Sequence, residues 1–255
     1  MVNFALSVGA AAGILLSAGF VLWEVGRYAA PQVPKSRFDE RKEMIAYTAG
    51  LFVGIPLVIP FLFLFQALPM LALGGVALYL AALVGGTELA QFLLLRSAYF
   101  GRDGAGPFYA LGLRCGIAGL LVIALVTEYF SGPSFSLPGA LAAISVSLGI
   151  VSLEGMGAIL SMPASKAPGR PRQGGPWSGI PMAAVGFVLI GFGYGSGALA
   201  GGLIGLLVAG GAFLLYRSAA PGVLSSVPPP SGPDAGPSEG EPTPFARTDR
   251  RPGGR

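Results

Sequence analysis

Residues Gly191–Gly205 spell GFGYGSGALAGGLIG, and the conformation of this stretch decides the fold of the chain. Glycine recurs throughout it, and long apolar segments flank it on both sides. Three structures are compatible with such a segment: a pore-lining loop, a loop that binds phosphate, or a turn between two closely packed membrane helices. Each requires different neighbouring segments, so the composition and the order of the apolar stretches discriminate among them.

The composition is typical of a membrane protein. Of the 255 residues, 53% are hydrophobic and 11% are charged, and the mean hydropathy of +0.70 exceeds that of soluble globular proteins. The 41 glycines agree with this class, because close helix packing in lipid favours small residues. The net charge of +4 is not arranged as the basic, aromatic-rich face that binds nucleic acid. We therefore expect the lipid bilayer, and no nucleic acid, as a partner.

The residue types that are missing exclude several chemistries. The chain has no histidine, which excludes bis-His haem, His-ligated zinc and Ser-His or Cys-His catalysis. Its only cysteine, Cys115, lies in an apolar segment and leaves neither a disulfide nor a CxxC redox pair. Lysines and aspartates lie outside the apolar segments, which excludes a retinal Schiff base and paired intramembrane aspartates. We expect no catalytic residues, no metal site, no cofactor and no enzymatic activity.

Seven apolar stretches are long enough to cross a bilayer, which takes about 20 residues of helix for roughly 30 Å of hydrocarbon. They are Phe4–Glu24, Ala46–Gln66, Leu68–Leu95, Phe108–Phe130, Leu137–Met162, Ser178–Gly195 and Ala198–Tyr216. The sequence thus predicts an all-α integral membrane protein with a seven-helix transmembrane domain at residues 1–217. An alternative for the first stretch is a cleaved signal peptide, although it lacks a basic N-terminal region.

The connections between the stretches differ in charge and predict the orientation. Basic residues gather at 25–45, after the third and fifth stretches, and at the start of the tail, whereas the N-terminal end and the connections near 67, 131–136 and 195–197 have none. Because cytoplasmic loops are enriched in Lys and Arg, we expect the N-terminus outside, the C-terminus in the cytoplasm, and a location in the cell membrane. The mixed-charge run DERKE at 39–43 predicts a solvated half-turn that leads into the second stretch as a charged helix entrance. The Pro-, Gly- and Ser-rich residues 218–255 predict a disordered cytoplasmic tail.

This arrangement decides among the three structures for Gly191–Gly205. The FGYGS segment is similar to a potassium-channel selectivity filter, but a re-entrant pore helix there would place two basic segments on opposite sides of the membrane. The Thr-Val that would precede the filter is also absent. A phosphate-binding glycine loop needs a preceding strand, and here membrane helices flank it on both sides.

Helix packing is the remaining interpretation, because glycines recur every four residues and allow the backbone of a neighbouring helix to approach closely. The residues with this spacing are Gly193, Gly197, Gly201 and Gly205, with Gly50 and Gly54 in the second stretch and Gly112 and Gly116 in the fourth.

Three ionisable residues lie inside the predicted spans. Glu88 is eight residues before Arg96 and Glu154 is eight before Met162, which places each ~12 Å from the cytoplasmic end. Arg114 lies six residues after Phe108, or ~9 Å from the same side. The three therefore reach nearly one depth, although their helices alternate in direction.

Two functions follow from this candidate cluster. In a scaffold or accessory subunit, Arg114 pairs with Glu88 or Glu154 and the cluster is structural. In a small secondary transporter or proton- or cation-coupled carrier, the cluster lines a cytoplasmic cavity as an ion or proton site, with Gln91 and Ser152 adding polar groups. A dry, fully paired contact would argue against the carrier. We expect membrane protein partners or a second copy of the chain as further partners.

Overall fold

In the computed structural model the described residues are 2–29, 39–67, 73–100, 105–131, 136–161, 179–195 and 197–224. Within these ranges the chain is helical and contains no strand, as expected for an all-α protein. Its elements are α1 (Val2–Glu24), η1 (Val25–Ala29), α3 (Glu40–Ala67), α4 (Leu73–Arg96), α5 (Gly106–Ser131), α6 (Leu137–Leu160), α7 (Gly179–Gly195) and α8 (Ala198–Leu224). The expected turn after Ala67 and the tail beyond Leu224 lie outside the described residues.

The seven α-helices coincide with the seven apolar stretches, with shifts at the start of α3 and the end of α8, and α4 is described from Leu73, five residues after the predicted start of the third stretch. Helix α3 begins six residues before Ala46, so the charged run forms the entrance of the helix as predicted, although Glu43 within it is buried rather than solvated. Helix α8 continues to Leu224, past the expected start of the tail. In its last turns Ala219 and Ala220 are buried.

In the described part of the chain, four helical stretches are long and apolar enough to cross a membrane. They are Phe4–Arg27, Gly106–Ser131, Leu137–Leu160 and Ala198–Pro221. The fold therefore fits a multi-pass membrane protein. Seven crossings, and the direction in which the chain enters the membrane, stay predictions.

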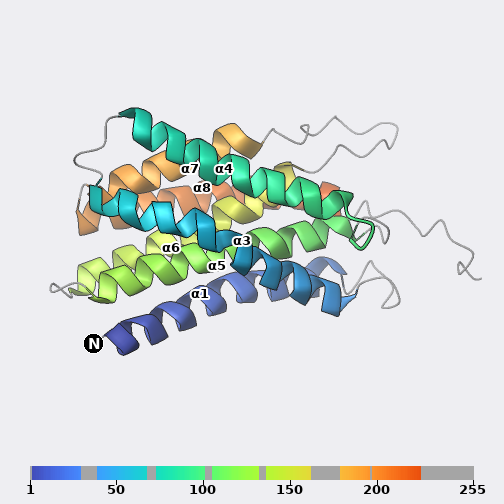
Figure 1. Ribbon diagram of the computed structural model, residues 1–255, viewed down its shortest axis with the longest axis horizontal. Coiled ribbons are helices and arrows are strands. Elements are labelled where there is room, and N and C mark those ends of the chain that lie inside the picture. The colour runs from blue at the N-terminus through green and yellow to red at the C-terminus, as the bar shows by residue number, and fades with distance from the viewer. Residues whose placement is uncertain are drawn as a thin grey trace, which may run out of the picture.

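Helix α5 is the centre of the bundle. Figure 1 shows the helices side by side, with α5 and α6 between α1 on one side and α4 and α7 on the other. Helix α5 packs along α1, α3 and α6, and α6 packs along α8. Most side chains of α5 are buried, including Phe108, Tyr109 and Leu121 at 0% exposure. The structure thus surrounds Arg114 of α5 with protein.

The corner between α5 and α6 is fixed by side-chain hydrogen bonds. Ser136 caps α6, because its Oγ accepts the amide proton of Gly139 at 3.2 Å. The Tyr129 hydroxyl, near the end of α5, donates to the Ser136 carbonyl at 2.7 Å. Pro138 lies in the first turn, where a helix has no use for the missing amide proton.

Glycines of α3 and α5 bring the two backbones into contact. A Cβ at Gly50 would collide with the Leu113 carbonyl, and one at Gly116 would collide with the Tyr47 carbonyl. Gly54 lies against Leu120 and Ile117, and Gly112 lies against Glu43. We call this contact the α3–α5 seam.

The glycines of α8 differ from one another. Gly205 lies against the backbone of Ser145 and Val146 of α6, and Gly201 is buried. Gly197, which the spacing placed on the same packing stripe, lies directly before α8, in the triplet Gly195-Ser196-Gly197 whose composition predicts a connection between two helices. Its φ of +102° is in the left-handed region that favours glycine, and a Cβ there would have no atom within 4 Å. The surroundings of Gly193 lie outside the described residues.

The seam gives a first prediction. Gly116→Ala should lower the free energy of unfolding by about 1–3 kcal/mol, because the added methyl group meets backbone that cannot rotate away. Gly210→Ala is the matched control, since a Cβ at Gly210 has no atom within 4 Å. Thermal unfolding of the purified protein in detergent measures both. Equal melting temperatures for the two variants would contradict a close α3–α5 contact.

Candidate functional site

Arg114 is the largest fully buried side chain among the described residues, at 0% exposure. Its Nη2 donates to Oε1 of Glu88 on α4, and its Nη1 donates to Oε2 of Glu154 on α6 at 3.2 Å. Glu88 and Glu154 are themselves 3% and 2% exposed. The structure therefore brings together the three ionisable residues that the sequence placed at one depth, as two ion pairs that share one guanidinium.

Gln91 is the fourth member of this cluster. It lies one turn after Glu88 on α4 and accepts a hydrogen bond from Arg114 Nε through its own Oε1. Its Nε2 donates to the Ala158 carbonyl of α6 at 3.3 Å. The amide thus links α4 to both α5 and α6, and each nitrogen of the guanidinium has an acceptor. We call Glu88, Gln91, Arg114 and Glu154 the Arg114 cluster.

Two residues of the site were missed by sequence reasoning: Gly157, on the Glu154 face of α6, and Ser161, which caps the end of α6. The Ser161 hydroxyl donates to Glu88 Oε1 at 2.6 Å. A Cβ at Gly157 would collide with Arg114 Nη1, so the absence of a side chain makes room for the guanidinium. Gly157 and Ser161 follow Glu154 by three and seven residues, and this helical spacing could have indicated them. Ser152, which the sequence proposed as a polar neighbour, is half-buried two residues away, on another face of α6.

The geometry restricts what the Arg114 cluster can do. Its side chains are buried and bind one another, which is the arrangement that offsets the cost of removing charges from water. One guanidinium faces two carboxyl groups, so full ionisation of the cluster leaves one negative charge in excess. Among the described residues, no three His, Cys, Asp or Glu side chains are grouped as ligands for a metal ion.

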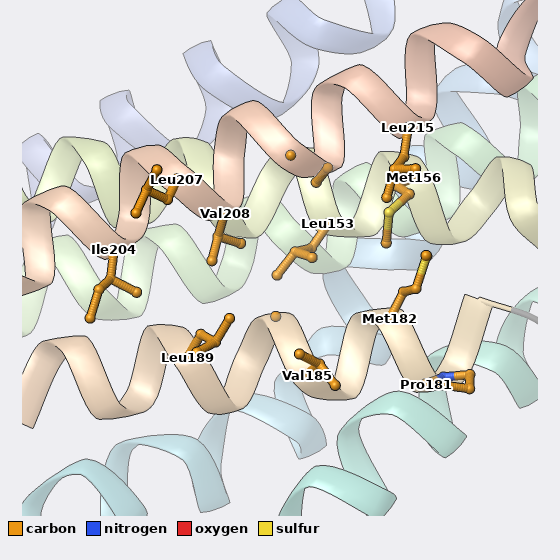
Figure 2. A pocket seen from close by; sticks show the side chains of 13 residues that line it. Leu153, Met156, Pro181, Met182, Val185, Leu189, Ile204, Leu207, Val208 and Leu215 are labelled. Atoms are coloured by element: carbon orange, nitrogen blue, oxygen red, sulfur yellow. The ribbon is translucent and has the colours of Figure 1, made fainter.

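A cavity of about 480 Å³ lies elsewhere, between α6, α7 and α8. Figure 2 shows Leu153 and Met156 of α6 pointing into it, opposite Met182, Val185 and Leu189 of α7, with Leu207 and Val208 of α8 along its side. Every described residue that lines it is apolar or glycine. Leu153 and Met156 lie on a different face of α6 from Glu154, and no residue of the Arg114 cluster lines the cavity.

Comparison with known protein families, with curated proteins and with solved structures finds no match to this chain. The described fold fits a helical multi-pass membrane protein, with four helices long and apolar enough to cross a bilayer.

The cluster gives a second prediction. Arg114→Leu should lower the free energy of unfolding by about 3–5 kcal/mol, because it leaves Glu88 and Glu154 buried without their countercharge. Arg41→Leu is the matched control, since Arg41 is exposed on α3. Combining Arg114→Leu with Glu154→Gln should cost less than the sum of the two single changes, with a coupling of about 0.5–3 kcal/mol. Strictly additive losses in chemical unfolding would contradict an ion pair.

Proposed function

We propose that this chain is a non-enzymatic component of the cell membrane, a scaffold or accessory subunit that crosses the bilayer seven times. The observation that carries this proposal is the burial and mutual pairing of the Arg114 cluster, which joins α4, α5 and α6. A site that binds a substrate needs polar groups that converge on an open cavity. In this chain the described cavity is lined by apolar side chains, and the side chains of the Arg114 cluster are buried and bind one another.

The surface of the bundle adds support for a role in assembly. Large apolar side chains of α1 and α8 are exposed, including Leu15 and Leu199 at 73% and Leu207 at 75%. In a bilayer these side chains meet either lipid or another helix. A membrane protein partner or a second copy of the chain would pack against them.

A carrier is the second candidate, and the excess of carboxyl groups over guanidinium in the Arg114 cluster favours it. If one carboxyl group exchanged a proton with the cytoplasm during a transport cycle, the cluster would have to open along α4 or α6. Glu154 is the better candidate for this exchange, because among the described residues its side chain is bonded to Arg114 alone, at 3.2 Å, whereas Glu88 binds both Arg114 and Ser161.

The third prediction separates the two candidates. The purified protein in liposomes should show no proton or cation flux above that of protein-free vesicles. Glu88→Gln, Arg114→Leu and Glu154→Gln should each lower the yield of folded protein and change nothing else. A flux that Glu154→Gln abolishes while the yield of folded protein stays at the wild-type value would favour the carrier and overturn the scaffold proposal.

The fourth prediction tests the proposed topology. Protease sites or tags inserted in residues 30–38 and after residue 225 should be accessible from the same side of oriented membrane vesicles. A tag at the N-terminus should be accessible from the opposite side, because the chain would cross the bilayer seven times between the ends. Access to the first and last sites from different sides would overturn both the seven crossings and the cytoplasmic tail.

A further inference from the structure

Glu43 is a buried carboxyl group outside the Arg114 cluster. It lies in the first turns of α3, and its neighbours Glu40 and Arg41 are exposed, whereas Glu43 is 5% exposed. This burial differs from the solvated half-turn that the mixed-charge run predicts.

The position of Glu43 follows from the α3–α5 seam. Glu43, Tyr47, Gly50 and Gly54 recur at spacings of three and four residues, which places them on one face of α3. The glycines meet α5 at Gly116 and Ile117, and Glu43 meets α5 at Gly112, one turn earlier. Its carboxyl group therefore occupies a position in the seam where the other members are glycine or aromatic.

Among the described residues, neither Oε1 nor Oε2 of Glu43 has a hydrogen-bond partner, and no ion pair involves this residue. On α3 itself, Lys42 is directed elsewhere, because its Nζ donates to the Tyr99 carbonyl at 3.0 Å. The one buried guanidinium nearby on α5, Arg114, is occupied by the Arg114 cluster.

None of the remaining charged groups among the described residues forms an ion pair with Glu43. The Arg27 guanidinium of η1 interacts with Glu24 and lies over the Trp23 ring. Cys115 of α5 is fully buried and lies three residues after Gly112 and next to Gly116, the two α5 glycines that contact α3. Glu24 of α1 interacts with the Cys115 thiol and adds a second carboxyl group to this region. On α4, Glu88 binds Arg114, and the Arg96 guanidinium lies over the Phe92 ring.

We propose that Glu43 is a proton-binding site, and that the bound proton holds the first turns of α3 against α5. An unpaired carboxylate in the seam would cost several kcal/mol, because nothing there replaces the water it has lost. A proton removes that charge at little steric cost. When the proton leaves, the carboxylate regains water only if the start of α3 separates from α5.

The direction of the pH dependence follows from the difference between the Glu43 carboxyl group in the closed seam and the same group in water. The closed seam holds the proton at a pH at which a solvated carboxyl group has already lost its own. Closure is therefore favoured at low pH and is lost as the pH rises. Release of one proton limits the change in the opening equilibrium to about tenfold per pH unit. This switch is independent of whether the chain is a scaffold or a carrier.

Cys115 provides the test, because it is the only cysteine of the chain, is fully buried, and lies between Gly112 and Gly116 of the seam along α5. The full-length protein in lipid nanodiscs would be treated with N-ethylmaleimide between about pH 5 and about pH 9. Dividing each rate by that of the unfolded protein at the same pH removes the titration of the thiol itself. We expect the normalised rate of the wild type to rise with pH by up to about tenfold per unit.

Glu43→Gln is the decisive variant, because it has the shape of the protonated acid and cannot ionise. It should fold as the wild type does and keep Cys115 protected at every pH, with a flat normalised rate. Glu40→Gln is the matched control, since Glu40 is exposed on the same turn, and it should retain the wild-type pH dependence. Equal pH dependence in Glu43→Gln and the wild type would overturn the proposal, and so would a Glu43→Gln protein that fails to fold.

A second variant changes the α5 side of the contact between Glu43 and Gly112. In Gly112→Ala the new methyl group would occupy the place of the Glu43 carboxyl group, with Cδ only 3.0 Å away. The carboxyl group should then be expelled, so that Cys115 reacts faster at low pH and its normalised rate no longer depends on pH. Wild-type protection and pH dependence in Gly112→Ala would overturn the proposal. A negative result here leaves the liposome flux assay, and the proposed function that it tests, unaffected.

Discussion

A guanidinium group enclosed by helices has to find both its hydrogen-bond acceptors and its countercharge on neighbouring helices, and this requirement governs the packing around α5. Arg114 is fully buried, and its three nitrogens bind Glu88 and Gln91 of α4 and Glu154 of α6. Because one residue of helix turns a side chain by about 100°, a slip of α4 or α6 by one residue would remove an acceptor and leave charge unpaired. The contact therefore fixes three helices at one depth.

Where α5 meets α3, the contact depends on small residues and close backbone packing rather than on paired charges. There is little hydrophobic driving force between helices in lipid, so close contact depends on small residues that let backbones approach. Gly50 and Gly116 provide this contact on α3 and α5, and Gly205 does so between α8 and α6. The central helix is thus held by charge on one side and by shape on another. Glu43 is the exception, because it places an ionisable group within the contact that depends on shape.

Polar groups and open space are separated in the described part of this protein. The Arg114 cluster has its donors and acceptors in contact, while the cavity between α6, α7 and α8 is lined by side chains such as Leu153 and Met156. A site that binds a ligand requires both in one place: polar groups to orient the ligand and a space to receive it. Their separation on different faces of α6 is the physical basis for proposing a scaffold rather than a carrier.

The sequence by itself determined the helical class, the positions of the helices within a few residues, and the common depth of Glu88, Arg114 and Glu154. These follow from the lengths of apolar stretches and from the rise per residue, which are local quantities. The tertiary structure alone decided that Ser161 and Gly157 complete the site, that Ser152 faces elsewhere, that Gly197 lies outside the packing contact, and that Glu43 is buried. Spacing gives the face of a helix on which a residue lies, but the neighbour that this face meets depends on how distant segments pack.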